Sequence, residues 1–304
     1  MMNAAMLKSI QFIIHHLLFI IFTQPPINKM KKLIMVMFLA ALALPMLMQR
    51  RVLAEELKIL LPLYSYPTHY NPKTYTWPLV AAAEKQVPIT VIINPNNGPG
   101  NGSPNQDYLQ GIKDLRAAGV TILGYVFTKY GDRSITKVKA DIDIYNSYYD
   151  VDGIFLDEAA SGINKLNYYQ EIYKYIKAKS KLRTVILNQG THTHEGYLTR
   201  SAADNIIIFE NYSKNWQGYQ PERYLNKHES KRFSTLIHTV PDVATMKSHI
   251  DRALARNVGY IYITDDSPDN PDKDPWNSLP SYWQEEVNYL QLLNRSLHER
   301  VKRK

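Results

Sequence analysis

Eight short apolar runs, recurring roughly every 30 residues, limit how this chain can fold more than any other feature. They cover residues 58–64, 89–93, 120–126, 153–157, 184–188, 206–210, 234–238 and 260–264. Segments with helical spacing of apolar residues separate most of them, although helices after the fifth and sixth runs are weakly marked. Continuous apolar strands indicate burial on both faces, which a parallel sheet covered by helices provides. The pattern predicts an α/β protein with a single (β/α)8 TIM barrel, and an open doubly wound sheet is the alternative.

The first 54 residues predict a leader segment. The stretch "MKKLIMVMFLAALALPML" from Met30 joins a positive start to an apolar core, and "VLA" at 52–54 places small residues at a cleavage position. We expect cleavage after Ala54 and export to the periplasm, the cell surface or the medium, with translation starting at Met1 or Met30. An uncleaved leader that anchors the chain in a membrane is the alternative. The expected barrel spans 55–293, and a basic tail spans 294–304.

Charge and cysteine content exclude several classes of function. The formal net charge is +8, but the basic excess lies in the leader and the tail, so the body is nearly neutral. We therefore predict no nucleic-acid partner. The chain has no cysteine, which excludes disulfides, a thiol nucleophile and a thiolate metal site. No stable protein partner is predicted.

The stretch "VDGIFLDEAASG" at 151–162 ends an apolar strand in two adjacent carboxylates, Asp157 and Glu158. In a (β/α)8 barrel the strand ends form the active face, so both carboxylates can reach the barrel mouth. Glu210 ends the sixth run at the same mouth. Like charges held close together raise one pKa, which leaves one carboxyl protonated and one ionised. Two such carboxyls are what glycoside hydrolysis requires, whereas helix capping or ion pairing is the structural alternative.

Polar and aromatic residues follow the other runs and predict a sugar-binding cleft, because flat rings suit the C–H faces of sugars. The predicted substrate-binding residues are Tyr64, Tyr66, Asn94, Tyr130, Asn188, Tyr212, Trp216, His238 and Asp265. Gln189 and Trp276 also belong to this set of residues that follow strands.

Other signals are weak. "GPGNG" at 98–102 lacks the G-x-G-x-x-G spacing of dinucleotide sites, and "TDDSPDNPDKD" lacks the glycine and the final glutamate of a calcium loop. "HTHE" at 192–195 fits no zinc pattern well, and no G-x-S-x-G occurs. These stretches therefore favour neither a dinucleotide site nor a metal site.

Several of these stretches together resemble one family. "LLPLYSYP", "ITVIINPNNGPG", "GYVFTKYGDR", "VDGIFLDEA" and "IIIFENY", in this order, are similar to the spherulin 4, or spherulation-specific family 4, proteins, which are grouped as glycoside hydrolase family 135. The resemblance runs from about Leu57 to Leu293. It implies a (β/α)8 fold, endo-cleavage of α-1,4-linked N-acetylgalactosamine in galactosamine-rich biofilm polysaccharides, and catalytic roles for Asp157, Glu158 and Glu210. It implies no metal and no organic cofactor.

Roles within the three acids follow by analogy with other barrel glycosidases. Asp157 is expected to act as the nucleophile or as the base that orients water, and Glu210 as the acid/base. Glu158 is expected to tune Asp157 and contact sugar. Two alternatives stay open, namely a catalytically silent polysaccharide-binding or wall-associated barrel, and a barrel α-glycosidase that cleaves another linkage.

Overall fold

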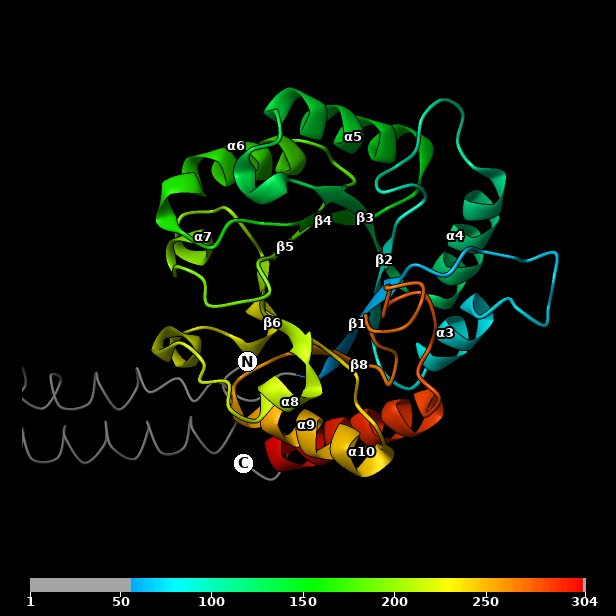
Figure 1. Ribbon diagram of the computed structural model, residues 1–304, viewed down its shortest axis with the longest axis vertical. Helices are drawn as coiled ribbons and strands as arrows, with labels where there is room; N and C mark the ends of the chain where they lie inside the picture. The colour runs from blue at the N-terminus through cyan, green and yellow to red at the C-terminus, as the bar shows by residue number, and fades with distance from the viewer. Residues whose placement is uncertain (1–55, 303–304) are drawn as a thin grey trace, which may run out of the picture. The chain divides into compact units, whose positions relative to one another are not determined.

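The computed structural model describes residues 56–302, in which eight parallel strands close into a barrel (Figure 1). The strands are β1 (Lys58–Leu63), β2 (Ile89–Ile93), β3 (Thr121–Phe127), β4 (Gly153–Asp157), β5 (Thr184–Asn188), β6 (Asn205–Tyr212), β7 (Phe233–His238) and β8 (Tyr260–Ile263). Each strand pairs with its neighbours in the sequence, and β1 pairs with β8 to close the ring. The predicted (β/α)8 barrel is confirmed, and the closed ring excludes the open sheet.

Helices surround the barrel, as Figure 1 shows. They are α3 (Trp77–Ala83), α4 (Gln106–Ala118), α5 (Ile135–Tyr148), α6 (Leu166–Lys177), α7 (Gly196–Thr199), α8 (Ser213–Trp216), α9 (Val243–Ala255) and α10 (Trp283–Lys302). The two connections with weak helical spacing hold α7 and α8, which are four residues long. Irregular chain replaces long helices there, together with two 3-10 helices before β7, Arg223–Lys227 and Ser230–Arg232.

Local sequence explains individual elements. Helix α4 begins after Asn105, whose side chain accepts the N–H groups of Asp107 and Tyr108, and ends at Gly119, whose φ of 97° favours glycine. Every residue of β2 is buried, as expected for a strand covered on both faces. Gly153 begins β4 where a Cβ atom would lie 2.1 Å from the Thr184 carbonyl oxygen, so only glycine lets β4 and β5 approach this closely.

The predicted boundary at 293 falls inside α10, so residues 294–302 continue the last helix. The buried Asn294 side chain accepts the N–H of Leu57 at 2.8 Å and donates to its carbonyl at 2.9 Å, which ties the helix to the start of the barrel. The predicted leader lies outside the described residues. Within 56–302, no helix combines the length and apolar character that crossing a membrane requires.

Candidate active site

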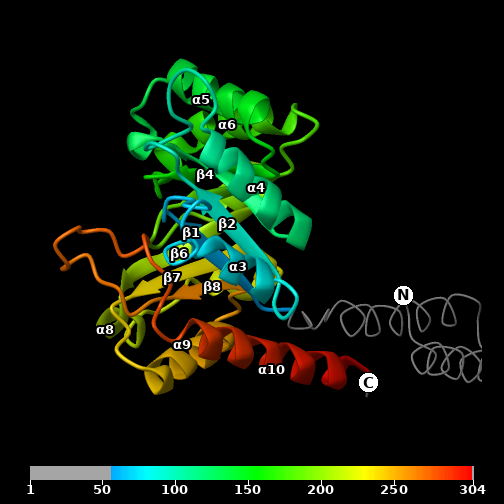
Figure 2. The same cartoon turned by 90° about the vertical axis from the view of Figure 1, so that its right-hand side faces the viewer.

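A pocket of about 390 Å³ opens at the barrel end where the strands terminate. Figure 2 shows α8 and the long loop after β8 at that end. The pocket is lined by Tyr130, Asp157, Glu158, Asn188, Gln189, Gly190, Glu210, His238, Pro268, Pro275 and Trp276. The three predicted catalytic carboxylates therefore share one cavity.

Strand register turns Asp157 into the barrel. Asp157 pairs with Phe127 on β3, so its side chain lies on the same face as Tyr125 and Phe155. The Tyr125 hydroxyl donates to Asp157 Oδ2 at 2.7 Å, and the Tyr125 ring packs against Phe155. A buried tyrosine thus holds one oxygen of the carboxylate in place.

A β-bulge turns Glu210 toward Asp157. On β6, Ile207 pairs with Ser234 but Phe209 pairs with the next residue, Thr235. Ile208 is therefore an extra residue, and beyond it each side chain points to the opposite face from the one expected in a regular strand. Glu210 consequently lies on the same face as Ile207, which pairs with Asn188 on β5. In a regular strand, Glu210 would point to the outside of the barrel.

Asn188 connects the two carboxylates. Its Nδ2 donates to Asp157 Oδ1 at 2.7 Å and to Glu210 Oε2 at 2.5 Å. Because both distances share one nitrogen, the two oxygens lie at most about 5 Å apart, which matches the ~5–5.5 Å spacing of retaining glycosidases better than the ~6.5–9.5 Å of inverting ones. The two carboxyls are therefore close enough to act on the same glycosidic bond.

The environment of Glu210 favours its protonated form. Burial, and next the negative charge of Asp157, raise the pKa of Glu210 to about 7, while hydrogen bonds from Asn188 and Trp276 oppose the increase. Asp157 receives two hydrogen bonds, which stabilise a negative charge on it. One carboxyl can thus donate a proton near neutral pH while its neighbour carries the charge.

Glu158 lies next to this pair in a left-handed conformation. Its φ is 48°, so the regular alternation of side-chain directions along β4 ends before it. The Glu158 side chain lines the pocket. The Thr128 hydroxyl donates to the carbonyl oxygens of Asp157 and Glu158, at 2.9 and 2.8 Å. The Tyr169 hydroxyl lies 2.9 Å from that of Thr128 and accepts the N–H of Ala160 at 2.9 Å. The end of β4 is therefore fixed by a network of buried hydroxyls.

Three of the predicted substrate-binding residues, Tyr130, Asn188 and His238, line the pocket. Burial lowers the pKa of His238, which favours a neutral imidazole. Two more contact residues of the site without lining the pocket themselves. The Tyr64 ring contacts that of Tyr125 at 5.9 Å, and the Tyr212 ring contacts His238 at 4.4 Å.

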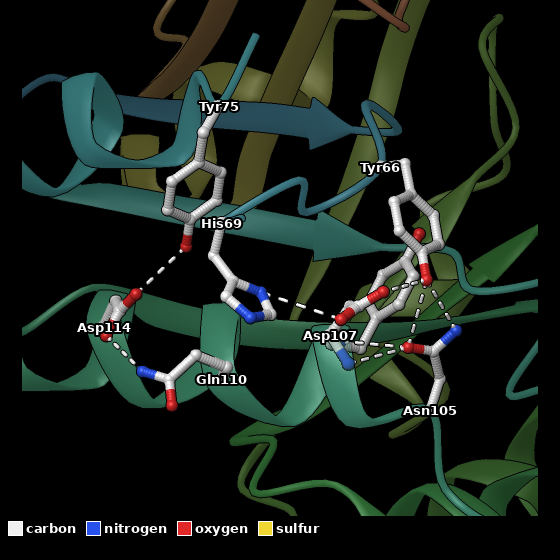
Figure 3. A network of polar contacts seen from close by, with 8 residues as sticks. Tyr66, His69, Tyr75, Asn105, Asp107, Gln110 and Asp114 are labelled. Atoms are coloured by element: carbon white, nitrogen blue, oxygen red, sulfur yellow. Dashed lines mark hydrogen bonds and ion pairs between the residues drawn. The ribbon is translucent and has the colours of Figure 1, made fainter. Parts of the chain in front are cut away.

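Four predicted substrate-binding residues lie apart from the pocket. Figure 3 shows Tyr66 pointing to the start of α4, where its hydroxyl donates to Asp107 at 2.6 Å. Asn94 accepts the N–H of Gly98 at 2.8 Å and so shapes its own loop. Trp216 is fully buried and donates to a backbone carbonyl of α9, and Asp265 accepts hydrogen bonds from the segment before α10. Each of these side chains supports the structure around it.

Sequence reasoning missed Tyr125, which lies two residues before the end of β3 and reaches the site through its long side chain. It also missed Pro268 and Pro275 of the loop after β8, which join the expected Trp276 in the pocket wall. The prolines near Trp276 were the available signal, since they stiffen a loop that carries a large ring.

Among residues 56–302, no group of three or more histidine or acidic side chains is arranged to hold a metal ion. The histidines of "HTHE" have separate partners. His192 Nδ1 lies 3.2 Å from Glu222, and His194 Nδ1 accepts the N–H of Gly196 at 2.9 Å.

Comparison with known proteins identifies the family. The model of spherulation-specific family 4 matches residues 58–290. Spherulin-4 of Physarum polycephalum is 36% identical over 251 residues, which cover 79% of this chain and 72% of spherulin-4. The crystal structure of Aspergillus clavatus Sph3 in complex with GalNAc superposes with a TM-score of 0.67 at 25% identity, covering 79% of this chain and 99% of Sph3. An alpha-L-fucosidase isoenzyme 2 from Paenibacillus thiaminolyticus (TM-score 0.54, 12% identity, covering 80% of this chain and 50% of the fucosidase) shares the fold alone. The chain belongs to spherulation-specific family 4.

Proposed function

We propose that this protein is a secreted glycoside hydrolase that cleaves within polymers of α-1,4-linked N-acetylgalactosamine and galactosamine, such as a biofilm exopolysaccharide. The observation that carries the proposal is the pair of carboxyls, Asp157 and Glu210, which a single amide nitrogen holds about 5 Å apart or closer. The raised pKa of Glu210, about 7, makes this residue the proton donor of the pair.

The geometry supports a two-step displacement. In the first step, Asp157 attacks the anomeric carbon while Glu210 gives its proton to the glycosidic oxygen, so that the leaving sugar departs as an alcohol. In the second step, Glu210 takes a proton from water, the water oxygen attacks the same carbon, and Asp157 leaves as a carboxylate. Two inversions retain the configuration at the anomeric carbon.

The substrate class rests on the family. Sph3, which shares the fold and 25% identity with this chain, was crystallised with GalNAc. A pocket that combines carboxylates, amides and aromatic rings suits the hydroxyls and C–H faces of such a sugar. Export, proposed from the leader sequence, would bring the enzyme to an extracellular polymer.

The test incubates the full chain with α-1,4-linked N-acetylgalactosamine oligomers and with a partly deacetylated polymer, and follows product masses. An Asp157→Asn variant is the matched control, because it keeps the shape of the side chain and removes the nucleophile. Shorter oligomers from the wild type alone would support an endo-glycosidase.

Binding of both proteins to the polymer without any cleavage would contradict the proposal and favour a silent polysaccharide-binding barrel. Cleavage of other α-linked sugars in a substrate panel, with N-acetylgalactosamine oligomers left intact, would favour an α-glycosidase of another linkage.

A further inference from the structure

The turn after β3 has an unusual backbone. Lys129, Tyr130 and Gly131 have positive φ values of 50°, 52° and 82°. Glycine adopts this left-handed region freely, whereas a side chain with a Cβ atom meets the carbonyl that follows it. Tyr130 therefore occupies a position where its backbone costs free energy that glycine would avoid.

Packing does not offset this cost. The Tyr130 side chain is 62% exposed, so it buries little apolar surface. Among the described residues, its side chain makes no hydrogen bond and no ring contact. Its backbone N–H donates to the Glu158 carbonyl at 2.6 Å. Neither local conformation nor the protein core explains a tyrosine here.

The position of the turn is nevertheless well fixed. Lys165 Nζ donates to Asp132 at 2.6 Å and to the Gly131 carbonyl at 3.3 Å. Thr128, which begins the turn, donates to the carbonyl of Asp157. The ring of Tyr130 is thus carried on a backbone joined directly to the end of β4, and it lines the pocket that holds the carboxylates.

We propose that Tyr130 is the aromatic platform of a sugar-binding subsite next to the point of cleavage. An exposed ring on a fixed turn can offer its face to the C–H groups of a pyranose without a loss of backbone freedom. The platform binds an N-acetylhexosamine ring of the polymer chain, and its contribution comes from the face of the tyrosine ring and not from the hydroxyl. This inference rests on the proposed function.

The test compares Tyr130→Gly, Tyr130→Phe and Lys129→Gly in the full chain. Lys129→Gly is the matched control, because it relieves the same backbone conformation at an exposed residue outside the pocket lining. Binding of α-1,4-linked N-acetylgalactosamine oligomers is measured by calorimetry in a Glu210→Gln background, which prevents turnover. Melting temperatures and KM are measured in the otherwise wild-type chain.

We expect both glycine variants to keep the melting temperature within about 3 °C, because relief of the left-handed backbone offsets the greater freedom of the unfolded chain. Tyr130→Gly should weaken oligomer binding about 10-fold, as expected when a ring of this size leaves a binding face. Tyr130→Phe and Lys129→Gly should bind as the parent does.

Equal binding by Tyr130→Gly and the parent would overturn the platform while leaving the proposed function intact, provided that the wild type cleaves the oligomers. An equal loss in Tyr130→Phe and Tyr130→Gly would also overturn it, because the hydroxyl would then be the binding group. If the wild type neither binds nor cleaves the oligomers, the proposed function fails, and the platform for this sugar fails with it.

Discussion

Replacement of Glu210 with glutamine tests the electrostatics of the site through stability as well as activity. The pKa of Glu210 is raised from 4.5 to about 7, chiefly by burial and then by the charge of Asp157. A difference of about 2.5 units corresponds to at most about 3 kcal/mol between the two protonation states, and partial solvent access to the pocket reduces it. Glutamine keeps the shape and cannot titrate.

The sign follows from proton binding. Because the pKa of Glu210 is higher in the folded than in the unfolded protein, the folded state binds more protons between pH 4.5 and about 7. The contribution of Glu210 to the free energy of unfolding is therefore complete below pH 4.5 and is lost as the pH rises through about 7. Relative to Glu210→Gln, the wild type should become less stable across this interval by up to about 3 kcal/mol.

Urea unfolding of both proteins at several pH values measures this difference. Burial also raises the pKa of Glu84 to about 7, but Glu84 is present in both proteins, so its titration cancels. In activity assays, the decline of kcat/KM above about pH 7 should disappear with Glu210. A stability difference that does not change with pH, or a rate profile that stays bell-shaped in the variant, would refute the assignment of Glu210 as the acid.

Three further substitutions test neighbouring features. Asn188→Ala removes a hydrogen bond that lowers the pKa of Glu210, so the alkaline limb of the pH–rate profile should move to higher pH. The same variant should lower kcat about 10-fold or more. Tyr125→Phe removes one donor to the proposed nucleophile, and kcat should fall about 10-fold with little change in melting temperature, because the ring stays. Gly153→Ala places a Cβ atom against the neighbouring strand and should lower the free energy of unfolding by about 2 kcal/mol or more in urea titrations. An unshifted limb, an unchanged kcat or an unchanged urea midpoint, respectively, would contradict these expectations.

The strands and the carboxylates could be predicted from sequence because they depend on short-range pattern. Apolar runs of β-branched residues mark strands buried on both faces, and parallel strands in sequence order bring their ends to one mouth. Asp157 follows from that rule without knowledge of any contact, whereas Glu210 also needs the bulge in β6 to face the barrel interior. Both carboxylates line the same pocket.

The supporting residues could not be predicted in the same way. Asn94 and Trp216 also follow strands, but one closes its own loop and the other packs against α9, and both outcomes depend on loop geometry. Tyr125 was not predicted because only the ends of strands were considered. Its side chain is long enough to reach Asp157 from within β3, which a shorter side chain could not do. Loop conformation and side-chain reach are properties of the folded chain.

The two key carboxylates reach the pocket through different backbone geometries. Asp157 reaches the pocket through the regular alternation of side chains along β4, because it lies on the same face of the sheet as Tyr125 and Phe155. Glu210 needs the bulge at Ile208; without it, Phe209 would point into the barrel and Glu210 would point outward. With the bulge, Phe209 packs outside against the ring of Trp216, 4.8 Å away, so one extra residue both buries an aromatic ring and aims the proposed acid. The bulge is therefore the feature of β6 on which the proposed chemistry depends most directly.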